Sequence, residues 1–231
     1  AYLSEIKPVF YYQFQTPKVT AAAGIFTRDM MHDDDYSTAF FSESERFFHN
    51  RMNGVLAQYN GKRDSYVEFV CDWEGMYSTL SREKFRILLA GRHYLDTFYY
   101  GFNYSMFHYA GQQGAPIENV VDLQLLTPCV GVRFNAFFDF DIKLGALLTA
   151  QRDRSFGHSW EKPCMGEFAF RISRWGLSLD ERLYVGDNIH PFFYGHELED
   201  GTPLPYGREL YPAESFFRTD QKVYSRTALS Y

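Results

Sequence analysis

The most regular pattern in the chain lies in residues 137–151, which read FFDFDIKLGALLTAQ. Every second residue from Phe138 to Ala150 is apolar, and the residues between them are polar or glycine except Leu147. A period of two is typical of a β-strand that presents one apolar face and one polar face. The alternation outlasts the ~5–6 residues of a typical globular strand and is long enough for the roughly nine to eleven residues that cross a membrane.

The same alternation recurs elsewhere in the chain. Residues 65–73, 97–110 and 167–173 each place apolar or aromatic side chains at alternate positions. The Asn60-Gly61 pair is a strong signal for a hairpin turn before the first of these segments. Together the alternating segments predict an all-β, antiparallel protein with roughly ten to twelve strands.

Residues 120–135 predict one irregular strand. Apolar side chains occupy odd-numbered positions up to Leu125 and even-numbered positions from Val130 onward. Pro128 lies at this change of phase, and proline has no backbone N–H to donate to a sheet ladder. We therefore expect a bulge or a break in the strand near Pro128.

Composition excludes several classes of protein. The 231 residues include 23 Lys and Arg against 29 Asp and Glu, a net charge of −6, so nucleic-acid binding is not expected. The 3 cysteines lack metal or redox spacing, so neither a metal nor a cofactor is predicted. No apolar run approaches the roughly 18 residues of a membrane-spanning helix, so a membrane protein with this sequence would have to be a β-barrel.

Residues 1–231 are expected to form a single domain, because no linker or internal repeat interrupts the pattern. Within the first long polar connection, residues 33–48 suit an external loop, a plug inside a barrel, or a fold other than a barrel. The longer connections are expected at residues 27–50, 111–119, 153–163 and 186–217.

Aromatic residues gather near the ends of the expected strands, and they make up 19% of the chain. The chain ends on an alternating segment, TALSY, whose last residue is Tyr231. This pattern resembles the Gram-negative outer-membrane β-barrels as a general class. The resemblance implies an antiparallel up-and-down transmembrane β-barrel in the bacterial outer membrane, with the lipid bilayer as its partner. It also implies that the chain starts after a cleaved signal peptide.

Alternation alone does not separate a membrane barrel from a soluble β-barrel or β-sandwich. In a soluble protein the apolar face of residues 137–151 would be buried, and the protein would bind a carbohydrate or an apolar ligand. In a membrane barrel the same face would meet lipid and the polar face would line the lumen. The long strands and their aromatic ends favour the membrane barrel.

Charged residues on the polar faces of the expected strands would share the lumen of such a barrel. A barrel of this size is narrow, so mixed charges would form a salt-bridged network that fills it or leaves a thin polar path. The residues expected to line the lumen or a pore are Glu68, Asp72, Arg86, Arg92, Asp122, Arg133, Asp139, Asp141, Lys143 and Arg171.

The last long connection carries aromatic and histidine side chains beside glycine and proline. Such side chains stack on sugars or hold a protein partner when they are exposed, and they pack on one another in a compact Ω-type loop. The residues expected to form a binding loop are His190, Phe192, Phe193, Tyr194 and His196.

The function predicted first is a non-enzymatic one: a narrow, porin-like channel for small solutes, or a membrane subunit of a surface complex. The alternative is an outer-membrane lipid hydrolase that performs acyl transfer with His158 and Ser159, which lie near Asp153. The chain has no Gly-x-Ser-x-Gly motif, which makes an enzyme the less favoured reading.

Overall fold

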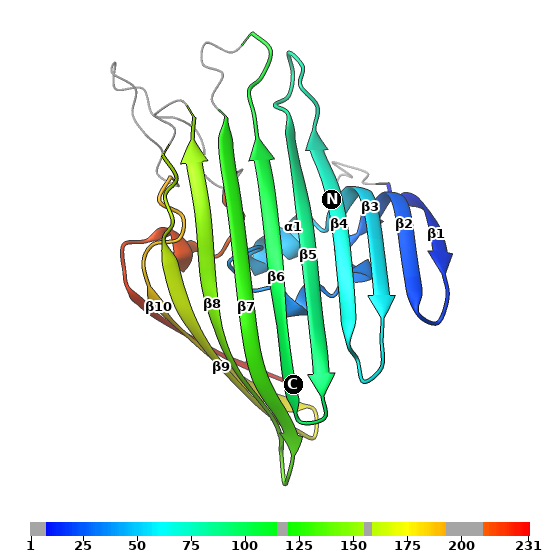
Figure 1. The fold of residues 1–231 in the computed structure, drawn as a ribbon, viewed down its shortest axis with the longest axis vertical. Coiled ribbons are helices and arrows are strands. Elements are labelled where there is room, and N and C mark those ends of the chain that lie inside the picture. The colour runs from blue at the N-terminus through cyan, green and yellow to red at the C-terminus, as the bar shows by residue number, and fades with distance from the viewer. Residues whose placement is uncertain (1–7, 115–119, 155–158, 193–209) are drawn as a thin grey trace, which may run out of the picture.

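The computed structural model describes residues 8–114, 120–154, 159–192 and 210–231. These residues form an antiparallel sheet of 11 strands, whose order in the sheet follows their order in the chain (Figure 1). The strands are β1 (Phe10–Gln15), β2 (Val19–Thr27), β3 (Arg51–Asn60), β4 (Tyr66–Gly75), β5 (Lys84–Leu95), β6 (Phe98–Tyr109), β7 (Val121–Asn135), β8 (Asp139–Asp153), β9 (Cys164–Arg174), β10 (Leu177–Gly186) and β11 (Val223–Ser230).

The predicted all-β, antiparallel, up-and-down arrangement is confirmed, and so is the predicted range of strand numbers. The predicted closure into a barrel is not found among the described residues. Strand β1 pairs only with β2, and β11 pairs only with β10, so the sheet has two open edges. All 6 residues of β1 are exposed, which shows that this edge strand extends beyond the packed part of the sheet.

The connections differ at the two ends of the sheet. Short turns join the strands at the lower end in Figure 1, and longer connections lie at the upper end. Trp175 and Gly176, between β9 and β10, have φ angles of 54° and 81°. Two positive φ angles are what a type I′ turn requires, and this turn matches the twist of the strands that it joins.

Strand β7 runs through Pro128 as one strand, and no register shift with β8 marks a bulge there. Of the two predicted irregularities, the bulge is wrong, and a local break is present because the pairing with β8 is interrupted at Thr127 and Pro128. On both sides of this break, the pairing keeps one register from Val121↔Asp153 to Asn135↔Asp139. The sequence changes phase because the two halves of β7 bury different faces. Apolar side chains near Val121 pack under the segments that cover one face of the sheet, and those near Val130 lie exposed on the other face.

Two segments pack against one face of the sheet, which we call the covered face. The first is residues 28–50, with η1 (Arg28–Met30), η2 (Asp33–Asp35) and α1 (Glu43–Phe48), and the second is residues 210–218, with η3 (Ser215–Arg218). Both lie against the sheet in Figure 1. Residues 33–48 therefore lie against the sheet rather than extending away from it. Buried side chains from both segments and the strands form the core, among them Phe26, Tyr36, Phe40, Phe41, Leu88, Leu125, Leu147 and Phe217.

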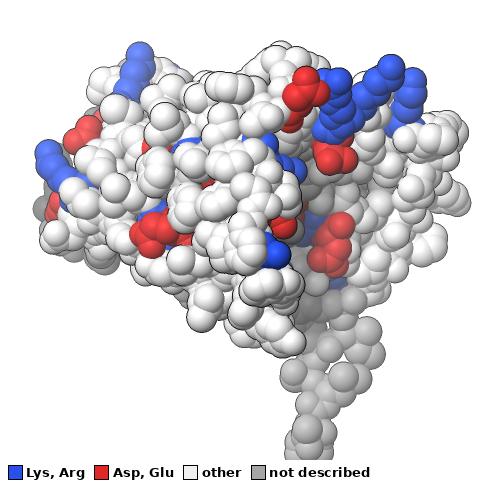
Figure 2. Space-filling model, turned by 90° about the horizontal axis from the view of Figure 1, so that it is seen from below, with Lys and Arg blue, Asp and Glu red and all other residues white. Residues whose placement is uncertain are grey.

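The opposite face, which we call the open face, carries exposed apolar side chains. In Figure 2, seen from the short-turn end, most of the visible surface is uncharged and the charged residues gather in separate groups. In the described ranges, every helix is too short or too polar to cross a membrane as a helix. Exposed apolar side chains of the open face include Val67, Phe98, Tyr100, Phe102, Val130, Phe134, Leu144, Leu148, Phe168, Leu179 and Val185.

Candidate functional site

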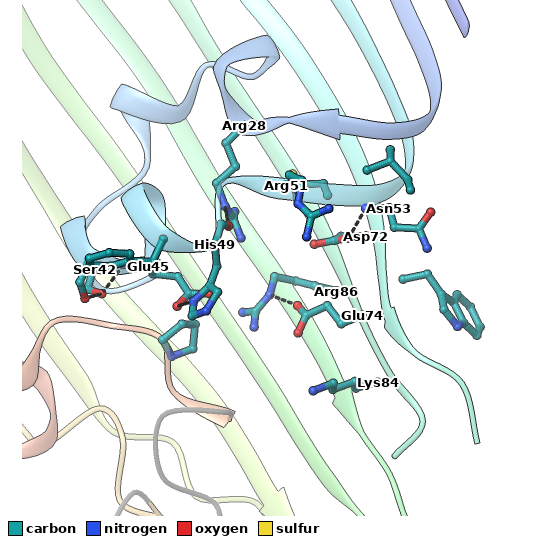
Figure 3. A pocket seen from close by; sticks show the side chains of 16 residues that line it. Arg28, Ser42, Glu45, His49, Arg51, Asn53, Asp72, Glu74, Lys84 and Arg86 are labelled. Atoms are coloured by element: carbon teal, nitrogen blue, oxygen red, sulfur yellow. Dashed lines mark hydrogen bonds and ion pairs between the residues drawn. The ribbon is translucent and has the colours of Figure 1, made fainter. Parts of the chain in front are cut away.

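A cavity of about 740 Å³ lies on the covered face beneath α1, at the long-connection ends of β3, β4 and β5 (Figure 3). Its walls combine basic, acidic and apolar side chains. The residues around it are Ile25, Arg28, Ser42, Ser44, Glu45, Phe48, His49, Arg51, Met52, Asn53, Asp72, Trp73, Glu74, Lys84, Arg86 and Pro212.

The cavity forms where β3 and β4 separate. Their last paired residues are Gly54 and Asp72, although β3 begins at Arg51 and β4 ends at Gly75. Beyond this point β3 stays paired with β2, and β4 stays paired with β5 through an irregular register. The Oδ1 atom of Asp72 accepts a hydrogen bond of 2.8 Å from the backbone N–H of Asn53, which satisfies a donor at the point of separation.

Arg28 reaches into the cavity from η1 and is only 4% exposed. Its Nε donates to the carbonyl oxygen of His49 at 3.2 Å, and its guanidinium lies 3.9 Å above the ring of Phe41. Its Nη1 has no hydrogen-bond partner among the described residues. Burial, followed by the positive charge of Arg86, lowers the pKa of Arg28. The site therefore holds the desolvated guanidinium of Arg28, whose Nη1 can donate to an acceptor in the cavity.

Arg86 enters the same cavity from β5 and is also 4% exposed. Its Nε donates to Glu74 at 3.1 Å, and its guanidinium lies 4.0 Å from the centre of the Phe107 ring and 5.3 Å from that of Phe41. Phe41 thus contacts two guanidinium groups. Such cation–π contacts stabilise the groups but leave their in-plane N–H donors available to an acceptor.

A second polar cluster ties residues 28–50 to the sheet. Glu68 is fully buried and accepts hydrogen bonds from Gln58 Nε2 at 2.6 Å, Tyr36 Oη at 3.1 Å and the backbone N–H of His32 at 2.9 Å. Nearby, Asp35 pairs with Arg92 at 2.6 Å. These buried contacts give the covering segment a defined position on the sheet.

Most of the predicted lumen residues share the covered face. Arg133 pairs with Asp141 at 3.4 Å, and Lys143 pairs at 3.1 Å with Glu167, a buried carboxylate that the prediction did not include. The alternation of the strands places Glu68, Asp72, Arg86, Arg92, Arg133, Asp139, Asp141, Lys143 and Arg171 on this face.

Asp122 is the exception and lies on the open face. Its neighbours Val121 and Leu123 are buried on the covered face, so its own side chain points the other way. There it pairs with Arg152 at 2.5 Å and Arg154 at 2.8 Å. The error follows from the expected bulge at Pro128, because without a bulge Asp122 and Arg133 have opposite orientations.

The structure describes two members of the predicted binding loop, and both are buried. His190 is 2% exposed and Phe192 is 4% exposed, so neither offers a surface to a partner. The ring of His190 lies 4.6 Å from that of Tyr211, and burial lowers the pKa of His190 to about 3. Both side chains belong to the layer that covers the sheet. Phe193, Tyr194 and His196 lie outside the described residues.

The proposed hydrolytic pair is not assembled by any described contact, since His158 lies outside the described residues and Ser159 is exposed. Within the described part of the chain, no group of three or more His, Cys, Asp or Glu side chains is arranged to hold a metal ion. Sequence reasoning missed Arg28, Glu45, His49 and Glu74. Three of these lie in or next to a segment without periodicity, so no pattern marked them.

Comparison with known proteins yields no relative: the chain matches no protein-family model, no curated protein and no solved structure.

Proposed function

We propose that the chain is a non-enzymatic β-barrel protein of the bacterial outer membrane, with its open face toward lipid and its covered face toward the interior of the barrel. The observation that supports this proposal is the division of the sheet into two faces. Buried charges and both covering segments lie on one face, and exposed aliphatic and aromatic side chains lie on the other.

Solvation energy supports this orientation. Apolar surface exposed to water costs about 25 cal/mol per Å², and the same surface is solvated in hydrocarbon. The 15 residues of β7 and of β8 exceed the roughly nine to eleven that a tilted strand needs to cross a bilayer. Lipid does not hydrogen-bond to open strand edges, so the proposal requires β1 and β11 to be paired in the membrane.

Between the two roles predicted for such a protein, the packing of the covered face favours a membrane subunit of a surface complex over an open channel. Side chains such as Phe40 and Phe41 are almost fully buried between residues 28–50 and the sheet. A wide aqueous path does not fit through that layer.

A narrow solute path is the second candidate. It is favoured by a smaller cavity of about 270 Å³ on the same face, beside Arg92, Arg133 and Asp141. Single-channel recording of the protein in a planar bilayer tests this role. A subunit with a filled interior gives no stable conductance, whereas a solute path gives small, ion-selective steps.

The membrane position is tested with single cysteines that carry a polarity-sensitive label. Cys71, Cys129 and Cys164 are first replaced by serine, and a cysteine then replaces Leu144 on the open face or Arg171 on the covered face. In lipid vesicles, the label at Leu144 is expected to report hydrocarbon and the label at Arg171 to report a polar environment. A Leu144 label that reports water, in protein that stays monodisperse without detergent, would contradict the proposal.

A further inference from the structure

The basic side chains of the cavity beneath α1 are only partly balanced by its acids. Arg28, Arg51, Lys84 and Arg86 line it, against Glu45, Asp72 and Glu74. Each of these carboxylates already has a donor: His49 Nδ1 for Glu45 at 2.8 Å, the N–H of Asn53 for Asp72, and Arg86 Nε for Glu74. The free Nη1 of Arg28 is thus left without an acceptor among the described residues.

A buried, charged donor without an acceptor carries a large desolvation cost, and an anion that accepts its hydrogen bond removes that cost. Figure 3 shows the side chains of Arg28 and Arg86 extending into the same space from opposite sides of the cavity. A carboxylate or phosphate group between them would accept from both guanidinium groups. The inner part of the cavity is therefore suited to an anionic group.

The outer part of the cavity has a different chemistry. Where β3 and β4 separate, Trp73 is 41% exposed on β4, and Phe48 is 62% exposed at the end of α1. Ile25 and Met52 add aliphatic surface on the side of β2 and β3. Because Trp73 belongs to the open face, the separation of the two strands joins the cavity to that face.

We propose that this cavity binds an amphiphile with an anionic head group, whose head lies between Arg28 and Arg86 and whose hydrocarbon chain leaves through the gap between β3 and β4. A small polar anion would bind the arginines of the inner part but would leave the apolar outer part unfilled. A neutral lipid would fill the outer part but would leave the arginines without an acceptor. The inference rests on the proposed function in one respect: if the open face borders the bilayer, the bilayer is the source of the amphiphile.

Binding is tested with the full chain purified in detergent micelles, using cis-parinaric acid, a fluorescent long-chain carboxylate, and its uncharged methyl ester. The acid is expected to bind saturably, and the ester to bind at least about ten-fold more weakly, because a charged hydrogen bond to Arg28 is lost. Arg28→Gln is expected to weaken binding of the acid by a similar factor, and Arg28→Lys by less. Arg174→Gln, at the end of β9 and outside the cavity, is the matched control and leaves binding unchanged.

The role of the gap is tested with Asn53→Trp, which places a large side chain at the separation of β3 and β4. Steric exclusion is expected to lower the affinity for the acid at least about five-fold. If Arg28→Gln does not fold, this variant still tests the site. Competition then separates the head groups: oleate and a single-chain lysophosphatidate both displace the probe if the anion alone selects, and only one does if its geometry matters.

Displacement by inorganic phosphate at equal concentration would overturn the amphiphilic part of the proposal. Equal binding of the acid and the ester, or unchanged binding by both Arg28→Lys and Asn53→Trp, would overturn it entirely. If the label at Leu144 reports hydrocarbon in lipid vesicles, such a result rejects the binding site and leaves the membrane location standing.

Discussion

Glu68 illustrates what alternation predicts about a single residue. Its position in residues 65–73 assigned it to the polar face, and the structure places it there, fully buried. Two of its donors come from the covering segment. Tyr36 Oη lies 32 positions earlier in the chain, and the N–H of His32 lies 36 positions earlier. Local pattern identified the acceptor but not these partners, because the contacts exist only after the segment packs on the sheet.

We expect Glu68→Ala to destabilise the protein by about 3 kcal/mol, because it leaves buried donors of Gln58, Tyr36 and His32 without an acceptor. Urea unfolding in detergent, followed by tryptophan fluorescence, gives the change in free energy. Glu161→Ala, at an exposed position, is the control. Equal midpoints for the two variants would show that the buried cluster does not hold the segment.

His190 is expected to make stability depend on pH. Burial, followed by the positive charge of Arg218, lowers its pKa from the ordinary value of 6.5 to about 3 in the folded chain, because both disfavour the imidazolium. Between these values the unfolded state binds the proton more readily. Stability is therefore fully present above pH 6.5 and is lost as the pH falls toward 3, by up to about 1.4 kcal/mol per pH unit.

Unfolding of the wild type and His190→Phe across this pH range isolates the contribution of the imidazole. Phenylalanine suits a ring site beside Tyr211 and Phe217 and does not titrate. The variant is expected to lose less stability than the wild type on acidification. Parallel pH profiles would contradict the assignment.

At the scale of the element, residues 28–50 behave as a covering layer with an inner and an outer side. Phe41 is fully buried under the two guanidinium groups, and Phe47 in α1 is 77% exposed. Ser42 caps α1, since its Oγ accepts from the N–H of Glu45 at 3.1 Å. The helix is short, so packing of the segment rather than helix propensity fixes it on the sheet.

Phe41→Ala is expected to cost about 3–5 kcal/mol, as for other buried phenylalanines, and to release Arg28 and Arg86 from their shared ring. Phe47→Ala, in the same segment, is expected to change stability by less than about 0.5 kcal/mol. Limited proteolysis within residues 28–50 supplies a local readout. Cleavage rates that rise equally in both variants would show that this segment is not anchored through Phe41.

Strands β6 and β7 offer a prediction about a glycine. Tyr99 pairs with Gly131 across the ladder, and a Cβ added at Gly131 would overlap the Tyr99 ring. The ring also donates through its hydroxyl to Asp141 at 2.6 Å. Gly131 therefore allows the ring of Tyr99 to approach the backbone of β7 closely. In return, the ring covers the backbone that a glycine leaves exposed.

Gly131→Ala is expected to destabilise the protein by about 1–3 kcal/mol through overpacking, because the displaced ring loses its bond to Asp141. Gly166→Ala is the matched control in another strand, since its added Cβ would meet only the carbonyl oxygen of Val185, at 3.7 Å. Thermal unfolding of the two variants provides the comparison. A Gly131→Ala midpoint at or above that of Gly166→Ala would show that Tyr99 moves aside without cost.

The sheet as a whole has two contrasting faces and, among the described strands, two unpaired edges. The covered face has its own cover, and the open face has none among the described residues. Exposed apolar area of this kind is normal for a lipid-facing surface and unusual for a monomer in water.

Leu144, 57% exposed on the open face, distinguishes these two environments. In a bilayer, Leu144→Arg is expected to reduce folding stability by about 2–4 kcal/mol, because the charge would lie in hydrocarbon. In water the same substitution at an exposed site changes stability by about 0.5 kcal/mol or less. Refolding titrations into lipid vesicles measure the difference, and a negligible effect there would argue for a water-exposed face.

Side-chain alternation predicts the strands, their antiparallel order and the opposite character of their faces, because it is a local property of extended backbone. It does not predict that Arg28 and Arg86 contact the same ring of Phe41. It also misjudged β7, where a change of apolar phase reflects which face each half buries rather than a bulge at Pro128. Tertiary structure decided these features, because they depend on where residues 28–50 and 210–218 pack, and aperiodic segments carry no local signal of the surface that they will cover.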